Sequence, residues 1–171
     1  MSVVTHLSNA QAMTNLSQEA NTYRVALIVG AADIDSVIAW ADRQIEASTV
    51  PANPLIDISL GRSSPLSTLV AHLAELTDNT KDARSIKNAF AMVADRVRDN
   101  SIDLETAIMN CYRFLQSEGL LYHDDFDIFI NLEDDLSLIR DGIFGADRLA
   151  QLRADLLEAL DSMGDARQNA G

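Results

Sequence analysis

HDDFDIFINLEDDLSLIRDGIFG, from His123 to Gly145, combines the clearest helical pattern of the chain with its densest negative charge. At about 100° per residue, apolar residues spaced by three and four lie on one side of a helix. That side is predicted to contain Phe126, Phe129, Leu132, Leu136, Ile139 and Ile143. Asp124 or Asp125 is expected to cap the helix start, since a carboxylate accepts hydrogen bonds from its free N–H groups. Gly142 is expected to end the helix.

The opposite side of this helix is predicted to be a partner-binding surface. Its proposed residues are Asp124, Asp127, Ile130, Asn131, Asp134, Asp135, Leu138 and Asp141. Ile130 and Leu138 would form an apolar centre inside an acidic rim, an arrangement typical of protein interfaces. The alternative is a helix buried on more than one side, whose carboxylates form only a solvated face.

The rest of the chain repeats the helical spacing. Glycine and proline are scarce, with 7 and 3 copies, and this composition favours helices over sheets. Further helices are expected to begin at Ser17, Asp33, Ser64-Pro65, Asp82, Ser101 or Asp103, and Asp147. Leu55 to Ile58, between the prolines, is expected to form one short turn. The sequence therefore predicts an all-α fold, a single compact bundle of about seven helices, with stacked helical hairpins as an open alternative.

The length of 171 residues is typical of one domain. Residues 1–16 are polar and show little periodicity, so they are expected to form an N-terminal tail. Residues 17–163 are expected to form the single helical domain, and residues 164–171 a polar C-terminal tail.

Negative charge is concentrated in the second half of the chain. The net charge is −13, and residues 101–171 hold 15 acidic against 5 basic residues. Such a chain is repelled by nucleic acid and by anionic membranes, and it attracts a basic protein partner. Solubility alone is the open alternative.

The search for catalytic chemistry leaves one minor candidate. His72, with the pair His123-Asp124, resembles part of the ligand set of all-helical metal-dependent phosphohydrolases. A metal site needs more ligands than these, and Asp124 is already explained as a cap. Asp127, Asp134 and Asp141 are spaced by seven, so successive members lie ~10 Å apart on a helix and cannot share an ion. The sequence therefore predicts a non-enzyme with no catalytic residues, no metal and no cofactor.

The cellular setting is predicted from what the chain contains. Cys111 is the only cysteine, so no internal disulfide forms and a reducing compartment is expected. The longest apolar run, Val25 to Ala32, is much shorter than the ~20 residues that span a bilayer. The start of the chain lacks the pattern of a signal peptide. We expect a cytoplasmic protein and leave its oligomeric state open.

VIAWADRQIEASTVPANPLIDISL, from Val37 to Leu60, resembles the helix–proline–helix opening of small helical bacterial proteins, some of which are thought to be toxin-immunity proteins. The matching features are Trp40-Ala41-Asp42, the prolines near residue 51, and Leu55-Ile56-Asp57.

The later segment LEDDLSLIRDGIFG, residues 132–145, is similar to the C-terminal half of the same proteins, and the resemblance extends over residues 26–160. Its motifs are short and concern packing, so no functional residue is carried over. The resemblance implies an immunity or inhibitor protein that neutralises a toxin, and the negative charge of residues 101–171 predicts that this toxin has a basic cleft. The alternatives are a structural subunit of a larger assembly and the phosphohydrolase.

Overall fold

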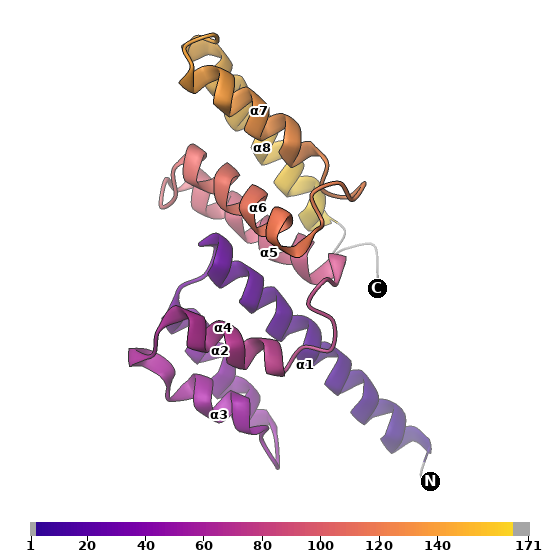
Figure 1. Ribbon diagram of the computed structural model, residues 1–171. Helices are drawn as coiled ribbons and strands as arrows, with labels where there is room; N and C mark the ends of the chain where they lie inside the picture. Colours follow the sequence, from indigo (N-terminus) through magenta and orange to yellow (C-terminus); the bar gives the residue numbers. More distant parts are fainter. Residues whose placement is uncertain (1–2, 166–171) are drawn as a thin grey trace. The chain divides into compact units, whose positions relative to one another are not determined.

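The computed structural model describes residues 3–165, which are helical through most of their length (Figure 1). In order, the elements are α1 (Val3–Val29), α2 (Ile34–Ala47), α3 (Asn53–Ser59), a 3₁₀ turn (Gly61–Ser63), α4 (Leu66–Glu75), α5 (Ala83–Arg98), α6 (Leu104–Glu118), α7 (Ile128–Arg140) and α8 (Ala146–Asp165). No strand occurs within this range. The all-α fold class is therefore confirmed. The helix beyond the predicted seven is α3, which extends the expected short turn to seven residues.

The chain forms two compact units. Unit 1 comprises the residues up to Leu27 together with Ala32–Ile86, and unit 2 comprises Ile28–Ala31 and the residues from Lys87 onward. Unit 1 thus contains most of α1 with α2, α3 and α4, whereas unit 2 contains most of α5 with α6, α7 and α8. A single cooperative domain over residues 17–163 stays a prediction.

Unit 1 is organised around Trp40. Its side chain is 2% exposed, its ring lies 5.2 Å from that of Tyr23, and its indole N–H donates to Glu19 at 2.8 Å. A buried indole thus has both an apolar contact and a hydrogen-bond partner. Asp33 caps α2 by accepting a hydrogen bond from the Ser36 N–H at 2.8 Å, as the sequence predicts. The surrounding core comprises Ala20, Leu27, Val37, Ala41, Leu55, Ile58, Leu69 and Leu73.

Unit 2 is organised around Phe90 on α5, which is fully buried. Three other phenylalanines meet its ring edge-on, with centroid distances of 6.1 Å to Phe114, 5.9 Å to Phe126 and 5.1 Å to Phe129. Helix α7 packs against both α6 and α8, and Figure 1 shows α7 and α8 lying side by side. Phe129 comes from the sequence-predicted apolar side of α7, together with buried Leu132 and Leu136, and Phe126 lies in the turns before the helix.

The start of α7 differs from the prediction. The helix begins at Ile128, and neither Asp124 nor Asp125 caps it, so that prediction is wrong. Tight turns precede the helix, and in them the Phe126 N–H donates to the His123 carbonyl at 2.8 Å. The side chain of Phe126 is buried there. These turns satisfy N–H groups that a cap would otherwise serve.

The end of α7 agrees with the prediction in one respect and differs in another. Gly142 has a φ of +73° and ends the helix, as expected. Its N–H donates to the Ile139 carbonyl at 3.0 Å, and the Ile143 N–H donates to the Leu138 carbonyl at 2.9 Å. This is the Schellman arrangement. The helix therefore stops before Ile143, which is 65% exposed rather than part of the buried side.

The boundaries at the two chain ends are also displaced. Helix α1 begins at Val3 rather than at Ser17, since residues 3–16 contain neither glycine nor proline to interrupt it. Helix α8 includes Gly164 and Asp165, which were expected in the C-terminal tail. Residues 1–2 of the predicted N-terminal tail and residues 166–171 of the C-terminal tail lie outside the described range.

Candidate partner-binding site

Helix α7 and its C-cap, Asp141, contain six of the eight residues predicted to bind a partner. Asn131, Asp134 and Asp141 are exposed. Their spacing places them on the side opposite buried Phe129 and Leu136. The two apolar residues proposed for the centre of this surface, Ile130 and Leu138, are only half-buried, as is Asp135.

The arginines near this face are already paired. Arg148 of α8 bonds the Asp135 carboxylate and lies 3.8 Å from that of Asp155. Arg140, in the last turn of α7, bonds Glu105 of α6. Because these guanidinium groups are matched by carboxylates within unit 2, they do not offset the charge of the exposed aspartates.

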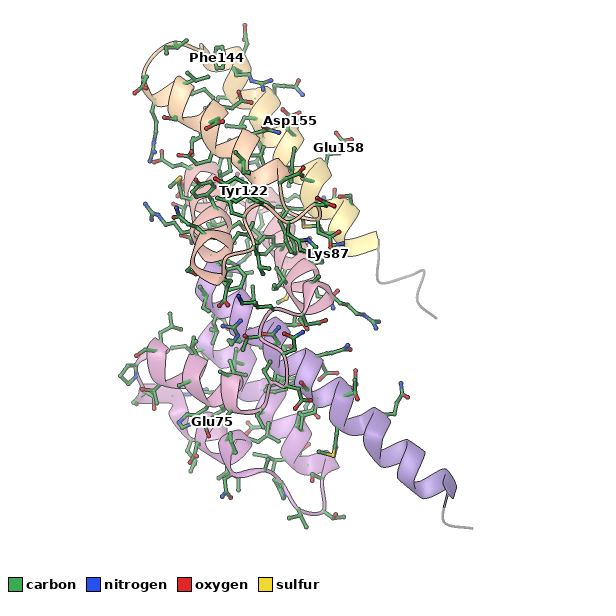
Figure 2. All side chains as sticks on the ribbon, turned by 45° about the vertical axis from the view of Figure 1, so that its right-hand side comes forward. Glu75, Lys87, Tyr122, Phe144, Asp155 and Glu158 are labelled. Carbon is green, nitrogen blue, oxygen red and sulfur yellow. The ribbon has the colours of Figure 1, made fainter. Side chains whose placement is uncertain are left out.

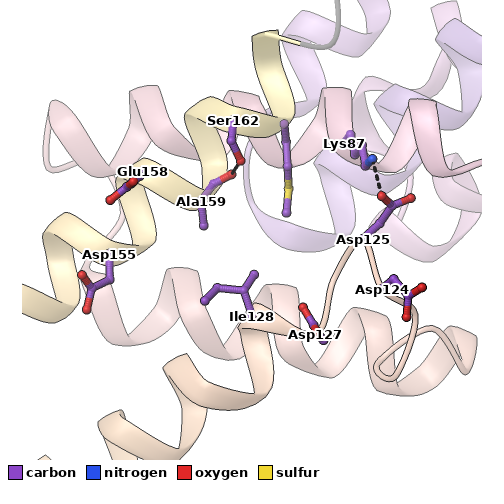
Figure 3. Close-up of a pocket in the computed structure, with 10 residues that line it drawn as sticks. Lys87, Asp124, Asp125, Asp127, Ile128, Asp155, Glu158, Ala159 and Ser162 are labelled. Carbon is purple, nitrogen blue, oxygen red and sulfur yellow. Dashed lines mark hydrogen bonds and ion pairs between the residues drawn. The ribbon is translucent and has the colours of Figure 1, made fainter.

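Five carboxylates lie around a groove of about 590 Å³ beside the start of α7 (Figure 3). Its walls come from α5, from the turns that precede α7, from the start of α7 itself, and from the second half of α8. It is lined by Lys87, Asp124, Asp125, Asp127, Ile128, Asp155, Glu158, Ala159, Ser162 and Met163.

The groove has an apolar floor and a strongly acidic wall. Ile128, Ala159 and Met163 supply the apolar part, and Met163 is only 5% exposed. Five carboxylates face a single ammonium group there. That ammonium, from Lys87, is held by Asp125 at 2.6 Å, with both side chains partly buried.

The remaining carboxylates differ in how far they are compensated. Asp155 accepts a hydrogen bond from Gln151 at 2.7 Å and lies near Arg148. Within residues 3–165, no ion pair involves Asp124, Asp127 or Glu158. All three are exposed. The groove thus presents three uncompensated negative charges beside an apolar floor, which suits a ligand with positive charge and some apolar surface.

This geometry redistributes the predicted site. Asp124 and Asp127 line the groove, whereas Asp134 and Asp141 lie further along α7. Sequence analysis missed Asp155 and Glu158 on α8. Their spacing of three does place them on one helix face, but only tertiary packing brings that face to the start of α7.

The histidines of the phosphohydrolase alternative are in different surroundings. His123 accepts a hydrogen bond from the Asp125 N–H at 3.3 Å and contacts the Phe126 ring at a centroid distance of 5.8 Å. His72, in unit 1, lies 3.4 Å from Glu75. In the part of the chain that the structure describes, no group of three or more His, Cys, Asp or Glu residues is arranged to hold a metal ion. The ligand set that the phosphohydrolase alternative requires is not found among those residues.

Comparisons with protein-family models, with curated proteins and with solved structures gave no match for this chain. None of the helices between residues 3 and 165 combines the length and apolar character that crossing a membrane requires.

Proposed function

We propose that this chain is a non-enzymatic binding module for a basic protein, and that the groove of unit 2 is the centre of its binding surface. The observation that supports this is the lining of the groove, where five carboxylates and one ammonium surround Ile128, Ala159 and Met163. Protein interfaces combine an apolar centre with a polar rim in this way. The exposed aspartates of α7 extend the acidic surface away from the groove.

Electrostatics favours a cationic protein over the other large partners of a cell. Unit 2 has 17 acidic and 8 basic residues in its sequence. Nucleic acids and anionic membranes would be repelled by this excess, while a basic protein would be steered toward it. The partner class that we favour is a toxin, as the resemblance to immunity-type proteins implies, and the negative charge of unit 2 suits one with a basic cleft. A nuclease toxin must present Lys and Arg to phosphate, so its cleft would match the groove.

The test begins with capture of a partner from native cells on the full-length chain, followed by purification of that partner. Its affinity is then measured for wild type and for the variant Asp124→Lys/Asp127→Lys/Glu158→Lys. We expect a loss of about a hundredfold or more, because like charges placed against each other cost several kcal/mol. The three residues are exposed, so helicity by circular dichroism should be retained.

The matched control is Glu46→Lys/Asp57→Lys/Asp78→Lys, which makes the same change in net charge on exposed residues of unit 1. It should weaken binding only slightly, through the long-range field. A second variant, Asp134→Lys/Asp141→Lys, separates the α7 face from the groove. Equal binding by wild type and the groove variant would refute the proposed site. A constant, stoichiometric partner whose affinity is the same for the wild type and for all of these variants would instead support the structural-subunit alternative.

A further inference from the structure

The turn between α7 and α8 and the start of α8 expose three large apolar side chains. Ile143 is 65% exposed, Phe144 is 37% exposed, and Leu149 in the first part of α8 is 43% exposed. Figure 2 shows Phe144 at the end of the α7–α8 pair where the two helices are joined. Single exposed apolar residues are ordinary, but these three lie within seven consecutive positions, and we refer to them as the apolar patch.

The backbone of this turn is fixed by hydrogen bonds. The Leu138 carbonyl accepts from the Ile143 N–H at 2.9 Å and from the Phe144 N–H at 3.3 Å. Gly142 supplies the left-handed residue that this closure requires. The two apolar side chains therefore project from a defined backbone, and a partner that covers them would lose little free energy to ordering the loop.

The charges around the turn are negative. Asp141 and Asp147 flank it in sequence and are exposed. The nearest arginines, Arg140 and Arg148, bond Glu105 and Asp135. Among the described residues, no ion pair involves Asp141 or Asp147. The apolar patch is therefore bordered by uncompensated carboxylates.

We propose that the α7–α8 turn, through Ile143, Phe144 and Leu149, is an apolar anchor for the basic partner, which covers it with an amphipathic segment rich in Lys or Arg. This inference rests on the proposed function and adds a second contact region to it. Charge complementarity favours a basic partner over other molecules that could cover the turn. A second copy of the chain would bring its own Asp141 and Asp147 against the same residues, and an anionic lipid surface would be repelled by them.

The test uses the full-length chain and two synthetic peptides as probes. The first is a helical peptide of about 15 residues, with leucine at steps of three and four and lysine elsewhere. The second has serine in place of every leucine and therefore the same charge. Binding of each labelled peptide is followed by fluorescence anisotropy at low salt. The wild type should bind the leucine peptide at least roughly tenfold more tightly, since buried apolar anchors dominate binding energies.

The decisive variant is Ile143→Ser/Phe144→Ser, which should remove the preference for the leucine peptide. The matched control, Val50→Ser/Leu60→Ser, changes two residues of unit 1 that are 84% and 79% exposed and should keep the preference. A turn variant that keeps the preference would overturn the anchor, as would a wild type that shows none.

These outcomes are separable from failure of the proposed function. If the groove variant with three lysines loses both peptides while the turn variant binds like wild type, the acidic site stands and the anchor is refuted. If the groove variant binds both peptides as well as wild type does, the proposed site itself is wrong. Sedimentation of a wild-type dimer that Ile143→Ser/Phe144→Ser converts to a monomer would mean that a second copy covers the turn, and would also overturn the inference.

Discussion

Replacing Phe90 by alanine should remove the centre of the unit 2 core. Phe90 is fully buried and meets three other phenylalanine rings edge-on, at centroid distances between 5.1 and 6.1 Å. Truncating a buried phenylalanine to alanine costs about 3–5 kcal/mol through lost apolar burial and the cavity left behind. Edge-on ring pairs contribute about 0.5–1.5 kcal/mol each beyond burial, so we expect a loss near the upper end, about 4–5 kcal/mol.

Phe90→Leu separates these two contributions. Leucine retains most of the buried volume but loses the three ring pairs, so the expected loss is smaller than for alanine, about 2–3 kcal/mol. Urea unfolding followed by far-UV circular dichroism measures both variants. With a slope of about 2 kcal/mol per molar urea, Phe90→Ala should lower the midpoint by roughly 2 M. A loss below about 1 kcal/mol for Phe90→Ala would show that these rings do not form the core of unit 2.

The same experiment tests the prediction of a single domain over residues 17–163. Trp40 is the only tryptophan, and it lies in the core of unit 1, so its fluorescence reports that unit while circular dichroism reports all helices. Two compact units that unfold as one domain give coincident transitions. We therefore expect Phe90→Ala to lower both midpoints together. A shift seen by circular dichroism alone would show that the units unfold separately.

Three further outcomes follow from local geometry. Gly142→Ala should destabilise the protein by about 1 kcal/mol in urea unfolding, because φ is +73° there, although no atom crowds the new methyl group. Gly145 lies in equally open space without a positive φ, so Gly145→Ala should change the free energy of unfolding by no more than about 0.5 kcal/mol. Burial raises the pKa of the Cys111 thiol, so a thiol reagent at mildly alkaline pH should label it only after denaturation, and rapid labelling of native protein would contradict its burial. Hydrogen bonds from the Thr106 side chain and backbone lower the pKa of Asp103. The contribution of Asp103 to stability is therefore present above the unfolded pKa of about 3.9, and it is lost as the pH falls through the lower folded pKa. An NMR titration that found an ordinary pKa for Asp103 would rule out this contribution.

Local rules were sufficient to predict much of the fold. The caps at Asp33 and Asp103 each accept a backbone hydrogen bond at 2.8 Å, and Gly142 ends α7 with a positive φ. These features depend on residues within a few positions of one another, so a single sequence contains the information. The buried side of α5 follows the helical spacing for the same reason.

The candidate site depended on contacts that no local pattern contains. Asp125 was expected to cap α7, but it pairs with Lys87, which is 38 positions earlier in the chain. The groove also needs Asp155 and Glu158 from α8. Local spacing identified α7 as acidic. The packing of α5, α7 and α8 determines which carboxylates at or beside α7 lie close to the carboxylates of α8. For that reason Asp124 and Asp127 belong to the groove, and Asp134 and Asp141 do not.

The pairing of charges bears on the alternative that the acidity serves solubility alone. Dispersed charges are enough to keep a protein soluble, and gathering like charges destabilises the compact state. In unit 2, Arg140, Arg148 and Lys87 are each matched by a carboxylate, yet uncompensated carboxylates still gather around an apolar floor. A bound cationic surface would relieve this repulsion and cover the floor at the same time. Dispersed solubilising charge provides no reason for such a concentration, and we therefore favour binding of a basic partner over solubility as the role of the acidic groove.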